Sequence, residues 1–305
     1  MSDSIIEKIQ QLKKQRNAVI LVHNYQLPEV QDIADFLGDS LDLSRKAAET
    51  SADVIVFCGV HFMAETAAIL SPNKTVLLPA LDSGCPMAEM VNAEKVRALK
   101  KQHPGALVVS YVNTTAEVKA ETDICVTSAN AVRIVQAFGD RPIIFLPDRN
   151  LGSYVASQTG KDMIIFDGYC PTHNNNILPE YVLKAKAEHP AAEVIVHPEC
   201  RPEVVKLADK VMSTSGMVNY ARVSAIQELI IGTEVGILHP LRKQNPDKKF
   251  YPVCEAALCK NMKKNTLEKI LWSLEEMKNV VKVDETIAVK ARKSIDKMLE
   301  YSRQD

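Results

Sequence analysis

The sequence lacks several features that mark specialised classes of protein. Its seven cysteines include no CxxC pair, which removes the common zinc-ribbon signature. Charge of one sign is not in excess, because 37 Lys and Arg face 38 Asp and Glu for a net charge of −1. No run approaches the ~18 apolar residues of a membrane span, and residues 1–15 lack the apolar core of a secretion signal. We therefore expect a cytoplasmic protein that binds neither nucleic acid nor membrane.

What the chain does contain is an internal repeat. Residues 7–25 and 94–113 each indicate a helix that ends in basic residues, a short break and a buried apolar strand, and residues 184–199 give a third copy. A His-Pro pair recurs 86 positions apart, at 103 and at 189. The predicted units are residues 1–87, 88–173 and 174–264, with two helices of 265–305, separated at 279–284, packing on the first unit.

Each unit indicates a small α/β layer structure. Three short β-branched runs per unit are separated by helical stretches, and such wholly apolar runs are typical of parallel strands buried on both faces. Three related units can pack around a pseudo-threefold axis. In the first unit we expect an extra amphipathic helix at about 27–50, between the first two strands. The predicted strand runs are 19–23, 55–59 and 76–80, then 107–111, 124–128 and 143–147, and finally 194–197, 211–215 and 229–233.

One cysteine closes each unit at a corresponding place. Cys85 closes the first and Cys170 the second, while spacing alone allows either Cys254 or Cys259 in the third. Scattered cysteines in an intracellular chain favour thiols or metal ligands over disulfides. Three converging thiolates would hold zinc or an iron–sulfur cluster, and three ligands leave one metal position open as a Lewis acid. The alternative is buried small residues of a repeat, which is our interpretation of Cys58, Cys125 and Cys200.

Polar residues follow the strands at the edge where a ligand site is expected in parallel α/β units. Aligned across the repeats, His23, Tyr111 and His197 are equivalent, and the residues two positions later lie on the same face of the strand: Tyr25, Asn113 and Glu199. Hydroxyl-rich turns at 127–130 and 213–216 offer donors to a carboxylate or phosphate. We expect His173 to line this site, whereas Ser40 and Asp148 are also interpreted as helix caps.

Several segments together resemble the quinolinate synthase family. They are HNYQLPEVQDIADFLGDSL, DSGCPMA, SYVNTTAEVKA, CVTSANAV, PDRNLGSYVA, VIVHPEC and CKNMKKNTLEKI, and they cover nearly the whole chain. The resemblance implies an α/β fold of three homologous αβα three-layer domains, with parallel sheets around a pseudo-threefold axis. It also implies a central [4Fe-4S] cluster held by Cys85, Cys170 and Cys259, which favours Cys259 over Cys254.

The implied reaction condenses iminoaspartate with dihydroxyacetone phosphate to quinolinate, for NAD biosynthesis, with release of phosphate and two waters. An aspartate oxidase or dehydrogenase would supply the iminoaspartate. Our own hypothesis is that Glu199 and Tyr25 move the protons of this reaction, with contributions from His23 and His197. The predicted substrate-binding set is His23, Ser40, Tyr111, Asn113, Ser128, His173, His197, Glu199, Ser213 and Thr214. Two alternatives stay open: a zinc-dependent lyase or aldolase on the same thiolates, and a non-catalytic protein that binds a small molecule.

Overall fold

The computed structural model describes residues 2–302. The first unit contains α1 (Ser2–Gln15), β1 (Ala18–His23), α2 (Pro28–Asp32), β2 (Phe36–Gly38), α3 (Ser40–Glu49), β3 (Val54–Cys58), α4 (His61–Leu70), β4 (Thr75–Leu77) and α5 (Pro86–Glu89). The second contains α6 (Ala93–Gln102), β5 (Leu107–Tyr111), α7 (Ala116–Ala120), β6 (Ile124–Val126), α8 (Ala131–Gln136), β7 (Ile143–Leu146), α9 (Arg149–Thr159), β8 (Ile164–Ile165) and α10 (Pro171–Asn176).

The third unit and the tail complete the chain. The third unit contains α11 (Pro179–Glu188), β9 (Glu193–Val196), α12 (Pro202–Val205), β10 (Lys210–Val211), α13 (Thr214–Val223), β11 (Glu228–Gly232), the 3₁₀ turn η1 (Val235–Ile237), α14 (Leu238–Gln244), β12 (Lys249–Pro252) and the 3₁₀ turn η2 (Met262–Lys264). The tail contains α15 (Leu267–Glu276) and α16 (Glu285–Ser302), which confirms the two predicted tail helices.

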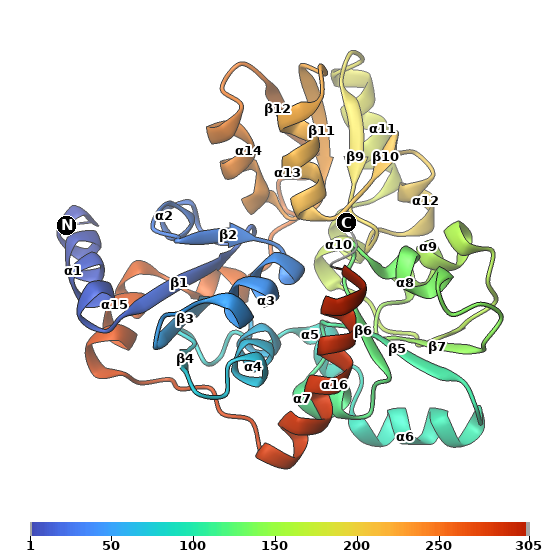
Figure 1. Cartoon of the computed structure of the whole chain (residues 1–305). Helices are drawn as coiled ribbons and strands as arrows, with labels where there is room; N and C mark the ends of the chain where they lie inside the picture. The colour runs from blue at the N-terminus through green and yellow to red at the C-terminus, as the bar shows by residue number, and fades with distance from the viewer. Residues whose placement is uncertain (1, 303–305) are drawn as a thin grey trace.

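The three units share one sheet topology. Within residues 2–302, each unit has a four-stranded sheet, and the strand orders β2-β1-β3-β4, β6-β5-β7-β8 and β10-β9-β11-β12 correspond strand for strand. All neighbouring strands within these sheets are parallel. Figure 1 shows the three sheets, each flanked by helices, grouped around the middle of the molecule. The predicted fold class of three α/β units with parallel sheets is confirmed.

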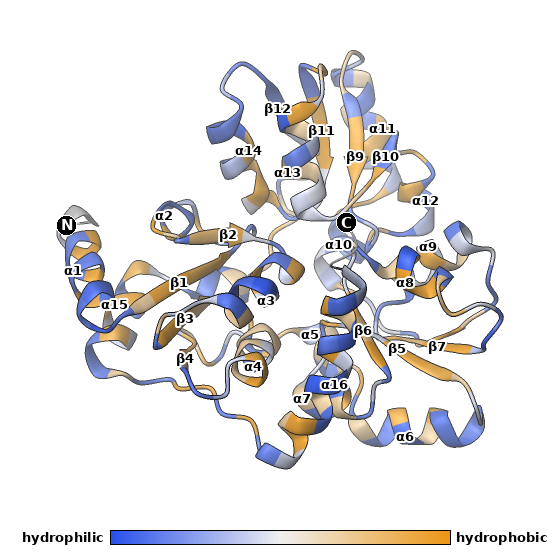
Figure 2. Ribbon diagram, viewed as in Figure 1, coloured by the Kyte–Doolittle hydropathy of each residue, from blue (hydrophilic) through white to orange (hydrophobic). Residues whose placement is uncertain are grey.

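The inner strands carry the core of each unit. Every residue of β3, β5 and β7 is buried, and Figure 2 shows the central strands as hydrophobic. Helices joined to parallel strands by crossovers cover both faces of a sheet, so these strands need no polar face. The outer strands β2, β8 and β10 have only two or three residues and are partly exposed.

The extra helix predicted at 27–50 in the first unit is wrong. That segment holds α2, the edge strand β2 and α3, and it corresponds to the stretch from α7 to α8 in the second unit. A repeated aspartate makes the correspondence plain, because each copy accepts a hydrogen bond from a backbone N–H of its unit's first strand. The pairs are Asp35 with Ile20, Asp123 with Val108 and Asp209 with Val194, each at 2.8 Å.

The two tail helices pack on different units. Helix α15 lies against α1 of the first unit, as predicted, but α16 lies chiefly against α7 and β6 of the second unit and also touches α4. Its buried face includes Ala291, Ile295 and Met298. Helix α16 therefore bridges the first two units (Figure 1). The unit boundaries stay a prediction, and their outer ends at residues 1 and 303–305 lie outside the described residues.

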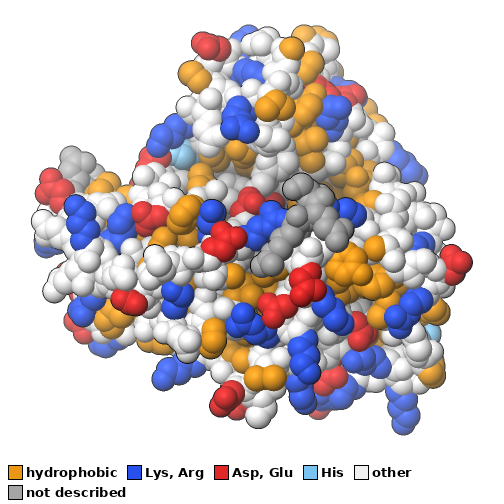
Figure 3. All heavy atoms as spheres, in the orientation of Figure 1, with side chains coloured by type: hydrophobic (Ala, Val, Ile, Leu, Met, Phe, Trp, Pro, Cys, Tyr) orange, Lys and Arg blue, Asp and Glu red, His pale blue; other side chains and the backbone are white. Residues whose placement is uncertain are grey.

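Among the described residues, no helix is both long and apolar enough to cross a bilayer. On the face drawn in Figure 3, basic and acidic side chains are interspersed. This mixture agrees with the near-zero net charge of the sequence.

Candidate active site

A cavity of about 540 Å³ lies where the strands of all three units end. All but one of the predicted site residues line it: His23, Tyr25, Ser40, Cys85, Tyr111, Asn113, Ser128, Cys170, His173, His197, Glu199, Thr214 and Cys259. The exception is Ser213, whose hydroxyl caps α13 by accepting a hydrogen bond from the Gly216 N–H at 3.2 Å. The repeat thus brings distant strand ends to one place.

Three hydroxyl groups reach the cavity from equivalent positions. Ser40 and Ser128 stand two residues beyond the ends of β2 and β6. Thr214 stands at the matching position of the third unit, shortly after β10. Ser40 and Thr214 are the first residues of ten-residue helices, whose N-termini favour anions. Asp39 rather than Ser40 caps α3, because the Asp39 carboxylate accepts from two backbone N–H groups. The Ser40 hydroxyl is therefore not needed as a cap.

The three cysteines from different units lie near one another. Cys85, Cys170 and Cys259 are partly exposed at the cavity, and each interacts electrostatically with the other two. Burial, together with the charge of a neighbouring thiolate, raises the pKa of Cys85 to about 12. Burial likewise raises the pKa values of Cys170 and Cys259. These sulfurs become thiolates when a bound cation supplies the missing positive charge, so this donor set fits a metal centre.

The other cysteines lie elsewhere. Cys58, Cys125 and Cys200 are fully buried, as interpreted from the sequence. Cys254 is half-buried against the apolar core of the third unit and does not line the cavity. Its position leaves Cys259 as the cysteine of the third unit that faces the shared cavity.

A chain of buried polar groups runs along one wall of the cavity. Glu199 Oε2 lies 2.8 Å from His173 Nδ1 and 3.4 Å from His197 Nδ1. His173 Nε2 lies 2.8 Å from the Thr233 hydroxyl, which is 2.5 Å from the Tyr25 hydroxyl. The contacts from Glu199 through His173 and Thr233 to Tyr25, at 2.5–2.8 Å, are within reach of proton transfer through hydrogen bonds.

Burial sets the charges along this wall. Burial alone would raise the pKa of Glu199, but the interaction and hydrogen bond with His173 lower it below its usual range. Burial lowers the pKa values of His23 and His197 to about 3, so both rings are neutral near pH 7. Burial raises the pKa of Tyr25 well above its usual value. The wall therefore carries one carboxylate and several neutral donors and acceptors.

Two polar atoms in this wall are buried without a hydrogen-bond partner among the described residues. They are Glu199 Oε1 and Asn113 Oδ1, and both residues line the cavity. A buried acceptor without a donor is costly, so its presence at a cavity indicates a ligand that supplies one.

Comparison with known proteins agrees with this geometry. The family model for the quinolinate synthetase A protein matches residues 7–300. The chain belongs to this family. It is 58% identical over 295 residues to a quinolinate synthase of Dehalococcoides mccartyi, with 97% of each chain covered. It is 57% identical over 300 residues to a quinolinate synthase of Thermodesulfovibrio yellowstonii, with 98% and 99% covered. The relatives are enzymes, and this chain is an enzyme as predicted.

This member of the family places further residues at the site that sequence reasoning missed. Thr233 connects Tyr25 to His173, and Glu234 and Lys263 contact the Cys259 loop. Asp148 caps α9 through Leu151, as interpreted, and also accepts from the Cys170 N–H. The alignment of the repeats could have identified Asp148 and Glu234, because both are acidic residues at equivalent positions.

Proposed function

We propose that this chain condenses iminoaspartate with dihydroxyacetone phosphate to give quinolinate, phosphate and two waters, as a step of NAD biosynthesis. One observation carries the proposal: thiols from three units face a cavity whose walls also hold a carboxylate, neutral imidazoles and hydroxyls. The quinolinate synthases that resemble this chain supply the name of the product.

Cys85, Cys170 and Cys259 would hold a [4Fe-4S] cluster. Support comes from the soft donors, their shared cavity and the raised pKa values that call for a compensating cation. When bound, a three-cysteine cluster supplies a Lewis-acidic iron with an open position toward the substrate.

The substrate groups would meet partners of matching chemistry. The Ser40, Ser128 and Thr214 hydroxyls face the cavity and can donate to the carboxylates of iminoaspartate. Neutral His23 and His197 can donate or accept one hydrogen bond without adding a charge. Tyr111 and Asn113, at the end of β5, supply further polar groups to the cavity. Asn113 Oδ1 has no hydrogen-bond partner among the described residues, so it can accept from the imine N–H.

Proton transfer would run along the buried polar chain. Isomerisation of the ketone, imine formation and the two dehydrations each remove a proton at one atom and return it at another. Ionised Glu199 can accept a proton, and His173 at 2.8 Å can pass it through Thr233 to Tyr25. In this scheme Glu199 and Tyr25 move protons at the reacting atoms, and His173 with Thr233 connects them.

One observation favours a second candidate. Donor atoms of Cys170, His173 and Glu199 lie within 4.8 Å of one another, and such a sulfur, nitrogen and oxygen set is typical of zinc. A zinc-dependent lyase or aldolase would use the same cavity.

Product formation tests the proposal. Protein purified without oxygen is given dihydroxyacetone phosphate and iminoaspartate generated in the same vessel by an aspartate oxidase, and quinolinate is quantified by liquid chromatography. We expect quinolinate from brown, iron-loaded protein and none after chelation. Colourless protein that carries zinc and splits or joins carbonyl compounds would favour the second candidate, and iron-loaded protein that binds both substrates without product would overturn the first.

A further inference from the structure

Two buried carboxylates occupy equivalent positions in the second and third units and have no role in the chemistry above. Asp148 follows β7 and Glu234 follows β11, at an offset of 234 − 148 = 86 residues. The same offset relates Tyr111 to His197, since 197 − 111 = 86. Both acidic side chains have 0% exposure. Burying a carboxylate is costly, so its retention at matching places calls for a specific partner.

The partner is the cysteine loop of the same unit. Asp148 Oδ2 accepts from the Cys170 N–H at 3.2 Å, and Glu234 Oε1 accepts from the Cys259 N–H at 3.0 Å. The second oxygen of each carboxylate accepts from the start of the next helical turn, at Leu151 and Gly236. Each carboxylate therefore fixes a cysteine against the end of a core strand.

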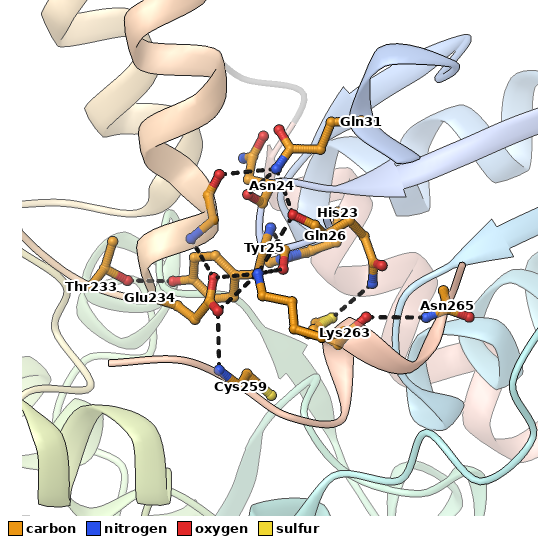
Figure 4. Close-up of polar contacts among 12 residues, drawn as sticks. His23, Asn24, Tyr25, Gln26, Gln31, Thr233, Glu234, Cys259, Lys263 and Asn265 are labelled. Carbon is orange, nitrogen blue, oxygen red and sulfur yellow. Dashed lines mark hydrogen bonds and ion pairs between the residues drawn. The ribbon is translucent and has the colours of Figure 1, made fainter. Parts of the chain in front are cut away.

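The third unit has an additional contact that reaches the first unit. Lys263 Nζ lies 2.9 Å from Glu234 Oε1 and donates to the carbonyl oxygen of Tyr25. Figure 4 shows Lys263 extending between Glu234 and the turn that carries His23 and Tyr25. The Lys263 side chain is only 14% exposed, so solvent does little to weaken these contacts.

The same junction is closely packed and held by a second hydrogen bond. Gln31 donates to the Gly236 carbonyl at 2.9 Å and to the Gln26 carbonyl at 2.8 Å. A methyl group at Gly236 would lie 2.6 Å from Lys263 Nζ and 2.9 Å from the Tyr25 carbonyl carbon. The Cys259 loop and the Tyr25 turn thus have little freedom to move independently.

We propose that Glu234 and Lys263 are positioning residues that couple the metal ligand Cys259 to the Tyr25 turn, whereas Asp148 positions Cys170 alone. The inference rests on the proposed metal centre at these cysteines. Hydrogen bonds from the backbone N–H groups of Cys170 and Cys259 to these carboxyl groups fix where each sulfur lies. Lys263 contacts Glu234 and the Tyr25 carbonyl, so it links the Cys259 loop to the turn that carries the Tyr25 hydroxyl.

Substitutions of similar shape separate the two roles. Glu234→Gln and Asp148→Asn should each let a chelator remove iron about 10-fold faster, the lower end expected for supporting contacts of a metal site. Lys263→Met should keep iron release within about threefold of wild type but lower kcat about 10-fold with little change in KM, because it moves Tyr25 and not the cysteine. Lys263→Arg should restore most of kcat by keeping the charge.

The matched control is Lys243→Met. Lys243 also joins the third unit to the first, through Asp32 at 2.6 Å, but its side chain is 62% exposed and lies apart from the cavity lining. Iron release, kcat and KM should all match wild type in this variant. Wild-type kcat in Lys263→Met, or wild-type iron release in Glu234→Gln, would overturn the inference.

The readouts also keep this inference distinct from the proposed function. Iron release needs no turnover, so it tests Glu234 and Asp148 even if wild-type protein binds iron and makes no quinolinate, which would end the proposed function only. If wild type is active and these variants behave like it, the coupling alone fails. Should Glu234→Gln not accumulate as folded protein, the comparison of Lys263→Met with Lys263→Arg still decides.

Discussion

Replacing Glu199 by Gln removes the negative charge from the buried wall of the cavity while keeping the shape of the side chain. Glu199 is 3% exposed and its Oε2 lies 2.8 Å from His173 Nδ1 and 3.4 Å from His197 Nδ1. A glutamine amide cannot take up a proton at neutral pH, so the first member of the proposed proton relay is lost.

The size of the effect follows from the role assigned to the carboxylate. General acid–base catalysis contributes about 10²–10⁴-fold, which corresponds to about 2.7–5.4 kcal/mol of barrier. Breaking a buried ion pair costs about 3–5 kcal/mol when the partner stays charged. Because a glutamine amide still forms hydrogen bonds at this position, we expect a smaller loss of stability, about 1–3 kcal/mol.

The assay compares quinolinate formation, iron content and substrate binding in anaerobically purified Glu199→Gln and wild-type protein. Turnover should fall by at least about 100-fold while iron content and substrate binding stay near wild type. A suitable control is Glu193→Gln, because Glu193 begins the same strand β9 and its carboxylate accepts from Tyr220 away from the cavity lining. Full turnover in Glu199→Gln would refute the relay, and loss of iron would make Glu199 a metal ligand.

Three further predictions follow from the site. Cys259→Ser should lower the visible absorbance and iron content of anaerobic protein, whereas Cys254→Ser should leave both unchanged; equal losses would contradict the ligand assignment. Burial and the charge of Lys263 lower the pKa of His23 to about 3, so between pH 6 and 4 the unfolded chain takes up a proton that the folded chain does not. His23→Gln should therefore reduce the loss of unfolding free energy on acidification by about 1.4 kcal/mol per pH unit, measured by urea titration, and an unchanged slope would refute the burial of a neutral ring. Gly236→Ala should lower the free energy of unfolding by about 1–3 kcal/mol, because the added methyl group overpacks the contact between the Cys259 loop and the Tyr25 turn. A stability equal to wild type in the same titration would show that this contact rearranges to make room for the methyl group.

The repeat made much of the fold predictable. Matching strand ends put His23, Tyr111 and His197 in register, and parallel sheets bring such positions to one edge, so their arrival at a common cavity follows from the sequence. The short edge strands β2 and β8 could not be predicted, because two or three residues carry too little periodicity and gain their hydrogen bonds only beside a formed inner strand.

The supporting residues were harder to predict for a different reason. Asp148 looks like an ordinary helix cap, and it is one, but its second oxygen meets Cys170, which lies 22 residues further along the chain. Glu234 meets Cys259 at a separation of 25 residues. Neither contact has a local pattern, so only the folded loops reveal that a carboxylate holds the cysteine backbone.

The most direct test of a three-cysteine cluster is the iron, acid-labile sulfide and zinc content of protein purified without oxygen. A [4Fe-4S] centre held by Cys85, Cys170 and Cys259 predicts iron and sulfide in equal amounts, about four of each per chain, with no stoichiometric zinc. One zinc per chain without sulfide, or the same iron content after all three cysteines are replaced by serine, would contradict the account.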